Sequence, residues 1–349
     1  MQTTAYQKLP YATAKSLRIL GKIRIEPGDF RVDEFPAYEP SGDGEHLLVR
    51  FEKTGLNTPD AVRRLAEAID CDPRDASWAG LKDRHAITTQ WASFHRVDPE
   101  AALGLELPGI RVLAAARHGN KLRTGHLRGN RFRIVVREPE GDADLALELL
   151  EQLRTNGVPN YFGEQRFGID GRNLLDARAW LIEGGRAPRD RFRRKLLVST
   201  LQSQAFNLWL LERLEAGRLA RVVPGDLLRK EDSGGLFINE DPAEDQRRMD
   251  GWELSATGPI YGLKMRNPEG EALALEQDVM ERTGITVDTF ARVRKLAAGT
   301  RRVARVRPAN ASVDTVPEGL SIGFDLPKGA YATVVLRELM KVDEAPDHT

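Results

Sequence analysis

The chain has 349 residues, of which 41% are hydrophobic and 30% charged, and its formal net charge is zero. This composition is typical of a water-soluble globular protein and excludes a disordered chain. No apolar run approaches the roughly 20 residues that cross a bilayer. The first eight residues contain no apolar signal core. We therefore expect a cytoplasmic protein without a membrane segment.

Cys71 is the only cysteine. It excludes an internal disulfide and a cysteine-rich zinc site. The sequence also has no P-loop, no dinucleotide-binding fingerprint and no histidine cluster at metal-ligand spacing. We therefore expect neither a metal nor a nucleotide or redox cofactor.

The cations are segregated along the chain. Acid-free basic stretches lie between Glu106 and Glu138 and between Asp288 and Asp314, and a third basic cluster runs from Arg186 to Lys195. Segregated cations can form one positive face that attracts a polyanion. One such stretch alone is compatible with an ordinary solvated face, whereas three together favour phosphate contacts.

The N-terminal part predicts short strands and one helix. Gly21 to Glu34 alternates apolar and charged residues around a Pro-Gly turn, which predicts two strands, and Glu45 to Glu52 predicts another. Thr58 is expected to cap a helix that has Pro59 as its first residue. Its apolar face comprises Val62, Leu65, Ala66 and Ile69. A helix packed on strands indicates an α+β layer rather than a doubly wound sheet.

Lys82-Asp83 is predicted to form a turn between a strand over residues 77–80 and a strand over residues 86–94. Thr88 and Gln90 fall on one face of the second strand. A carboxylate at a strand end beside a cation is a common way to present a group that must stay ionised. The alternative is that Asp83 only closes the turn, because Asp is frequent in turns.

The remainder predicts a mainly helical middle and a return to strands. A turn at Gly129-Asn130 is expected to precede a strand that ends at Arg137. Residues 321–326 alternate as a strand, and residues 330–340 fit either a strand or a helix. A strand pair is predicted at residues 224–228 and 235–238, and helices are predicted over residues 142–155, 173–182, 190–215, 271–281 and 287–298.

Three stretches resemble the signature motifs of one family. They are Gly80-x-Lys-Asp-x-x-Ala-x-Thr-x-Gln90, Pro159-Asn-Tyr-Phe-Gly-Glu-Gln-Arg-Phe-Gly168 and Leu326-Pro-x-Gly-x-Tyr-Ala-Thr-x-Val-Leu-Arg-Glu338. Together they make the chain similar to the TruD family of tRNA pseudouridine synthases over nearly its full length. Family members commonly have Phe where this chain has Tyr331, a departure that keeps an aromatic ring.

The resemblance implies an α+β fold with a mixed, mostly antiparallel sheet of the pseudouridine-synthase type and helices, plus an inserted, mainly helical α/β domain. The expected division is a split catalytic domain of residues 1–156 and 306–349 and an inserted TRUD-type domain of residues 157–305.

The resemblance also implies the site and the substrate. Asp83 is expected to be the catalytic residue, acting at the ribose either as a nucleophile at C1′ or as a base at C2′. The expected substrate-binding residues are Arg24, Phe30, Asn130, Phe132 and Tyr331. Core packing for the phenylalanines and turn capping for Asn130 are the structural alternatives. The implied partner of this expected monomer is tRNA, with uridine 13 as the usual target.

Two other classes of function share some of these features. A glycoside hydrolase would also place a carboxylate at an anomeric carbon, but it needs a pair of carboxylates. A non-catalytic RNA-binding protein would have the same basic stretches, without a use for the residues grouped around Asp83.

Overall fold

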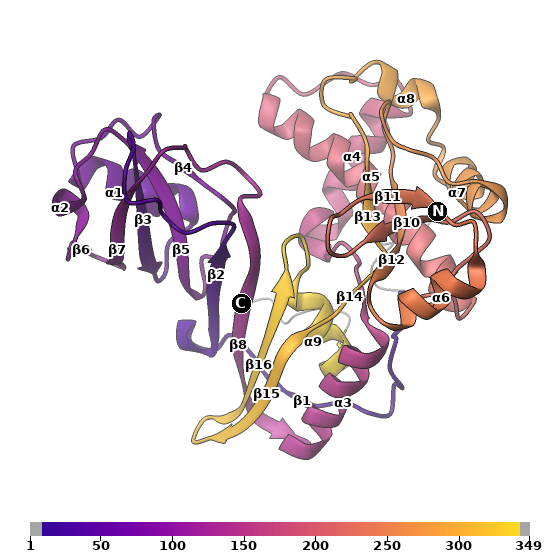
Figure 1. Ribbon diagram of the computed structural model, residues 1–349, viewed down its shortest axis with the longest axis horizontal. Helices are drawn as coiled ribbons and strands as arrows, with labels where there is room; N and C mark the ends of the chain where they lie inside the picture. The colour runs from indigo at the N-terminus through magenta and orange to yellow at the C-terminus, as the bar shows by residue number, and fades with distance from the viewer. Residues whose placement is uncertain (1–8, 343–349) are drawn as a thin grey trace.

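The computed structural model describes residues 9–342 of the chain. The first eight residues, in which no signal core was expected, and the last seven of the expected catalytic domain lie outside the described residues. Within the described range, a large sheet of ten strands and a small sheet of four occupy different parts of the molecule (Figure 1). No helix in this range is long and apolar enough to cross a membrane.

The large sheet combines both ends of the described chain. Its strand order is β15-β16-β8-β2-β5-β3-β7-β6, with β1 beside β8 and β4 beside β5. All its pairings are antiparallel except that of β2 with β5. In Figure 1, the yellow strands β15 and β16 return to lie beside β8. The strands are β1 (Leu20–Lys22), β2 (Phe30–Pro36), β3 (His46–Lys53), β4 (Ser77–Trp78), β5 (Ile87–His95), β6 (Glu106–Leu107), β7 (Ile110–His118), β8 (Leu127–Glu140), β15 (Ala309–Val316) and β16 (Gly319–Pro327).

The small sheet has the order β11-β10-β12-β13. It contains β10 (Leu227–Lys230), β11 (Leu236–Ile238), β12 (Leu254–Ile260) and β13 (Thr300–Val303). A separate antiparallel pair joins β9 (Val158–Pro159) to β14 (Arg305–Val306). This pair places the start and the end of the middle segment side by side.

Helices cover both sheets, and their ends follow local sequence signals. The predicted helix over residues 142–155 is α3, where the Asp142 side chain accepts a hydrogen bond from Leu145 N at 2.8 Å and Gly157, at φ 88°, ends the helix. The helices are α1 (Thr58–Ala68), α2 (Pro99–Ala102), α3 (Ala143–Asn156), α4 (Arg172–Leu181), α5 (Arg191–Glu215), α6 (Pro242–Asp250), α7 (Gly270–Thr283), α8 (Val287–Ala291) and α9 (Ala332–Met340), with short 3₁₀ turns at Pro27–Asp29, Glu164–Arg166 and Ile169–Gly171.

One face of the large sheet carries two hydrophobic cores. Phe30, Phe132 and Phe324 belong to the first core, which includes α3, α5 and α9, and Phe51 and Val62 belong to the second, under α1. Polar residues lie between them on the same face. The cross-strand register pairs Val32 and Lys53 with Thr88, Glu34 with Asn130, and Phe51 with Gln90, and residues directly opposite in a sheet share a face.

The structure corrects several local predictions. Gly129 and Asn130 lie inside β8 rather than in a turn before it, because β8 pairs with β2 and β16 along this whole stretch. Asn57 caps α1, and Thr58 is its first helical residue. The helix expected over residues 287–298 ends at Ala291 as α8. Of the two options for residues 330–340, the helix is correct. The predictions did not include strands β6, β7, β9, β12, β13 and β14 or helices α2 and α6.

Candidate active site

The Asp83 carboxylate is partly exposed and faces an arginine. Its Oδ2 lies 3.4 Å from Arg24 Nη2, and its Oδ1 accepts a hydrogen bond from His85 N at 3.0 Å. The side chain of Asp83 is 27% exposed, against 10% for Arg24. Each carboxylate oxygen therefore has one partner, a cation for Oδ2 and an amide for Oδ1, while the group remains accessible to a ligand.

Arg24 reaches this position through an unusual backbone conformation. Its φ is 62°, the left-handed region that residues with a Cβ rarely adopt, at a cost of order 1–3 kcal/mol. Its guanidinium lies over the Phe30 ring, 4.5 Å from the centroid, a favourable cation–π geometry. Asp29 accepts hydrogen bonds from Arg137 and from Glu26 N, which fixes the entry into β2 and hence the place of Phe30.

The expected aromatic residues lie next to one another. Phe30 and Phe132 meet edge to face with centroids 6.2 Å apart, and Phe132 lies 5.6 Å from Phe324. Phe30 is 3% exposed and Phe132 is 7% exposed. The packing role considered in the sequence analysis is therefore real for both rings, and only a small edge of Phe132 is open to a ligand.

The Lys82 side chain belongs to a buried polar cluster with Glu34 and Asn130. Its Nζ lies 2.7 Å from Glu34 Oε2, with side-chain exposures of 6% and 1%, and it also donates to Asn130 Oδ1 at 2.7 Å. Glu34 Oε1 accepts a longer bond from Trp91 N at 3.3 Å. Glu34 thus compensates Lys82, and the amide nitrogen of Asn130 is the end of that side chain that remains to donate.

Lys53 is fully buried beneath the turn. Its Nζ donates to the Asp83 carbonyl oxygen at 2.5 Å. Burial lowers the pKa of Lys53 to about 8; the Asp83 charge opposes this shift and the Lys82 charge adds to it. A cation that is expensive to bury is therefore retained at the backbone of the residue that carries the carboxylate.

Tyr331 belongs to a neighbouring cluster. Its hydroxyl accepts a hydrogen bond from Arg166 Nη2 at 3.2 Å, and its ring lies near Phe162. The Arg302 guanidinium lies 4.1 Å from the Phe162 centroid and 5.9 Å from that of Tyr331. Among residues 9–342, no direct hydrogen bond, ion pair or ring contact joins Tyr331 to Asp83. The other four expected substrate-binding residues lie around Asp83. Arg24, Phe30 and Phe132 form a chain of contacts that starts at the carboxylate, and Asn130 is bound by the neighbouring Lys82.

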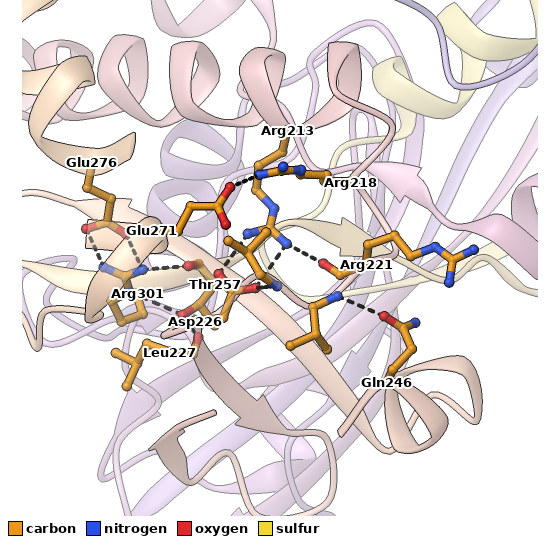
Figure 2. A network of polar contacts seen from close by, with 12 residues as sticks. Arg213, Arg218, Arg221, Asp226, Leu227, Gln246, Thr257, Glu271, Glu276 and Arg301 are labelled. Carbon is orange, nitrogen blue, oxygen red and sulfur yellow. Dashed lines mark hydrogen bonds and ion pairs between the residues drawn. The ribbon is translucent and has the colours of Figure 1, made fainter. Parts of the chain in front are cut away.

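The basic stretches divide into buried and exposed parts. Arg131 and Arg133 alternate with Asn130 and Phe132 on β8 and so lie on the opposite face of the sheet, where Arg131 pairs with Asp325 at 2.8 Å. Arg301 pairs with Glu276 in the interior (Figure 2), and Arg305 is 4% exposed. Arg301 and Arg305 are thus structural, Arg131 is an exposed but paired cation, and Arg133 is exposed. The exposed cations of the other clusters include Arg186, Arg189, Arg191, Lys195, Arg292, Arg294 and Lys295.

Sequence reasoning missed three members of the site. Lys53 follows Leu47, Val49 and Phe51 at period two, so its place on the buried face was readable, but the predicted strand stopped one residue short of it. Glu34 likewise follows Phe30 and Val32. Thr58 was assigned to a cap, and no local signal indicated that its hydroxyl contacts Lys82 N.

The arrangement offers one accessible carboxylate against a positive background. Such a group can attack a carbon or remove a proton. Glu34, the second carboxylate of the cluster, is buried and bound to Lys82, so it does not form the accessible pair that glycoside hydrolysis requires. Among the described residues, no group of three or more His, Cys, Asp or Glu side chains is placed to hold a metal ion.

The chain is similar to known proteins over almost its full length. A family profile described as tRNA pseudouridine synthase D (TruD) matches residues 8–175 and 190–339. A protein of Anaeromyxobacter dehalogenans named tRNA pseudouridine synthase D is 49% identical, covering 97% of this chain and 99% of its own. A protein of the same name from Thermus thermophilus is 44% identical, covering 98% and 94%.

The fold agrees with a solved structure. A crystal structure of a Methanosarcina mazei protein, described as a candidate tRNA pseudouridine synthase D, superposes with a TM-score of 0.69 at 25% identity, covering 97% of this chain and 96% of that one. This similarity confirms the expected α+β fold. The profile match and the identities show that the chain belongs to the TruD family of tRNA pseudouridine synthases.

Proposed function

We propose that this protein isomerises a uridine of tRNA to pseudouridine, with Asp83 acting at the ribose. The observation that carries the proposal is the Asp83–Arg24 pair, a partly exposed carboxylate 3.4 Å from a guanidinium. The pair lies within a chain that belongs to the family by all three comparisons.

The reaction breaks the N1–C1′ bond of the target uridine, turns the uracil and joins C5 to C1′; the hydrogen at C5 leaves as a proton and N1 gains one. The atoms balance without an oxidant or a second substrate. Asp83 serves either as a nucleophile at C1′ or as a base at C2′. In both cases an ionised carboxylate is needed, and the Arg24 guanidinium lies 3.4 Å from the Asp83 carboxylate.

The other expected residues have defined parts in this proposal. The Asn130 amide nitrogen donates to an oxygen of the extruded nucleotide, because its Oδ1 is already bound by Lys82. Phe132 offers a ring edge to the base, and Phe30 supports Arg24. Tyr331 contacts the nucleotide from the neighbouring cluster, its ring oriented by Arg166.

We further propose that the exposed cations position the tRNA. Phosphate contacts supply most of the affinity of nucleic-acid binding and fix its orientation. Arg186, Arg189, Arg191 and Lys195 are exposed and carry no ion pair within residues 9–342. Uridine 13 as the target, a monomeric state, independence of a cofactor and a cytoplasmic location complete the proposal.

The proposed division into residues 1–156 with 306–349 and an insert of residues 157–305 is supported by pairing at its boundaries. Val158 lies opposite Val306, and Pro159 opposite Arg305. The middle segment thus leaves and rejoins the large-sheet part at one place. The first hydrophobic core nevertheless runs through both parts, so the insert shares core with its host.

The test is pseudouridine mapping in tRNA incubated with the wild-type protein and with Asp83→Asn. The substitution keeps the shape and removes the charge. We expect modification at one uridine by wild type and a loss of at least about 10³-fold in kcat for the variant, with tRNA affinity within a few-fold. Binding without modification by the wild-type protein would instead establish a non-catalytic RNA-binding role.

A further inference from the structure

The Lys82-Asp83 turn is held from below by two hydrogen bonds to its backbone. Lys82 N donates to Thr58 Oγ1 at 2.9 Å, and the Asp83 carbonyl accepts from Lys53 Nζ at 2.5 Å. The Lys82 amide nitrogen begins the Lys82-Asp83 dipeptide, and the Asp83 carbonyl group ends it. Both ends of the segment that carries the carboxylate are therefore fixed.

Thr58 passes this restraint on to the sheet. Its hydroxyl has a single proton, and since its oxygen accepts from Lys82 N, that proton is free to donate to Gln90 Oε1 at 3.2 Å. Hydrogen bonds in such a chain polarise and strengthen one another. This contact gives a physical reason for the motif, in which Gln90 follows Asp83 by seven residues. Gln90 lies in β5 and, through Thr58, anchors the Lys82-Asp83 segment that precedes this strand.

The three supporting side chains belong to regular elements and are fully buried. Thr58 begins α1, Lys53 ends β3 and Gln90 lies within β5, and all three residues are 0% exposed. Exclusion of water strengthens their hydrogen bonds relative to those of a surface turn. The position of the Asp83 carboxylate is thus determined by elements that are distant in the sequence.

We propose that Thr58, Gln90 and Lys53 are positioning residues for the reaction, which hold the Lys82-Asp83 backbone so that the Asp83 carboxylate meets the ribose. The inference rests on the proposed function. Misplacement of a reacting group by about 1 Å can lower a rate about 10²-fold. Loss of these supports should therefore lower kcat much more than it alters substrate binding.

Lys53 adds a buried positive charge next to the Asp83 backbone. The charged groups around it are Asp83 and Lys82 of the turn, Glu34 of β2 through Lys82, and Arg24 through Asp83. Its register neighbours on the sheet, Thr88 and Ile110, do not titrate. Loss of the Lys53 proton would remove both a cation and the charge-assisted hydrogen bond to the turn.

The first experiment compares Thr58→Val with Thr58→Ser. Valine keeps the shape and removes the hydroxyl, whereas serine retains it. We expect Thr58→Val to lower kcat about 10- to 100-fold with KM within about two-fold, and Thr58→Ser to restore kcat to within a few-fold of wild type. Thr283→Val, which removes a buried hydroxyl bonded to Val279 O in α7, is the matched control and should leave kcat unchanged.

Amide hydrogen exchange provides a readout that is independent of activity. In Thr58→Val and in Gln90→Leu, the Lys82 amide should exchange faster than in wild type, while the amides of β3 stay protected. The double variant should lose little more kcat than either single variant, because the two residues act in one chain. The proposal would be overturned if Thr58→Val had the same kcat as wild type, or if Thr58→Val and Thr58→Ser lost kcat equally.

Lys53→Met tests the charge. With the pKa of Lys53 near 8, the wild-type kcat should decline above about pH 8, and this decline should be absent from a lower, flat profile of the methionine variant. An identical alkaline decline in both proteins would exclude Lys53 as its source. If wild type forms no pseudouridine at all, the proposed function fails, whereas the exchange of the Lys82 amide still reports whether Thr58 holds the turn.

Discussion

Two polar clusters in this protein bury charges in opposite ways. The buried arginine network, drawn in Figure 2, lies around the small sheet and consists of Arg213, Asp226, Arg301, Glu276 and Thr257. The site cluster lies on the large sheet and consists of Arg24, Glu34, Lys53, Lys82 and Asp83. Both contain cations and carboxylates that are largely buried, yet only the site cluster has the accessible carboxylate expected of an active site.

In the buried arginine network every charge is matched. Arg213 donates to both oxygens of Asp226, at 2.7 and 3.1 Å, and Arg301 donates to both oxygens of Glu276, at 2.9 and 2.5 Å. None of these four side chains is more than 4% exposed. Planar two-point pairs of this kind fix geometry and leave no capacity for a ligand.

The site cluster is unbalanced. Its three cations, Arg24, Lys53 and Lys82, face two carboxylates, Glu34 and Asp83, which leaves one surplus positive charge. The Asp83–Arg24 contact is long, at 3.4 Å, and Asp83 is the exposed member. The comparison teaches that buried charge alone does not mark an active site. An accessible, incompletely bound carboxylate in a positive surrounding does.

Removal of one carboxylate from each cluster should have the largest and most different effects on stability and turnover. Asp226→Asn should destabilise the protein by about 3–5 kcal/mol, because it leaves the Arg213 charge buried without compensation. Asp83→Asn should change the free energy of unfolding by less than about 1 kcal/mol while abolishing turnover. Chemical denaturation and pseudouridine assays on both variants measure this; loss of stability in Asp83→Asn would contradict it.

Replacing a whole pair sharpens the distinction. Glu276→Leu alone should cost several kcal/mol, whereas Arg301→Met combined with Glu276→Leu should recover most of that loss, about 2–4 kcal/mol, because buried pairs are often replaceable by apolar side chains. The double variant should stay active when folded. In the site cluster, Lys82→Met combined with Glu34→Leu should instead leave a folded protein of low kcat, since Asn130 and the turn lose their partner.

The pH dependence of stability separates the clusters further. The pKa of Lys53 is lowered from 10.5 to about 8, so the native state releases this proton before the unfolded chain does. Below about pH 8 the burial cost is fully present, and stability rises with pH from there toward about 10.5. Relative to Lys53→Met, wild type should gain on the order of 1–3 kcal/mol over this range in denaturation curves. A constant difference would refute the assignment.

The smallest expected effect concerns the surface. Arg189→Gln should reduce the salt dependence of tRNA binding by a slope of about 0.7–0.9, the loss of one phosphate contact. Arg131→Gln is the matched control, because Arg131 is paired with Asp325 on the sheet face away from Asp83. Equal slopes for the two variants, measured between low and moderate salt, would place the tRNA elsewhere.

Local patterns in the sequence were sufficient for several features. The strands on either side of Lys82-Asp83 and the α3 boundaries at Asp142 and Gly157 depend on neighbouring residues, and the structure confirms them. The turn itself falls on Arg84 and His85, directly after the predicted dipeptide. The family resemblance likewise indicated Asp83, Arg24, Phe30, Asn130 and Phe132, which the structure brings together, and Tyr331, which it places in a neighbouring cluster.

Only the tertiary structure decided which charges are paired and which remain accessible. Lys53, Thr58 and Gln90 meet the turn because β3, α1 and β5 pack together. In the sequence, Arg131 and Arg301 do not differ from the other cations of their stretches. In the structure, Arg131 pairs with Asp325, 194 residues away, and Arg301 pairs with Glu276, 25 residues away. Contacts between distant residues depend on sheet register and on the packing of separate elements, and neither is written in the local alternation of the chain.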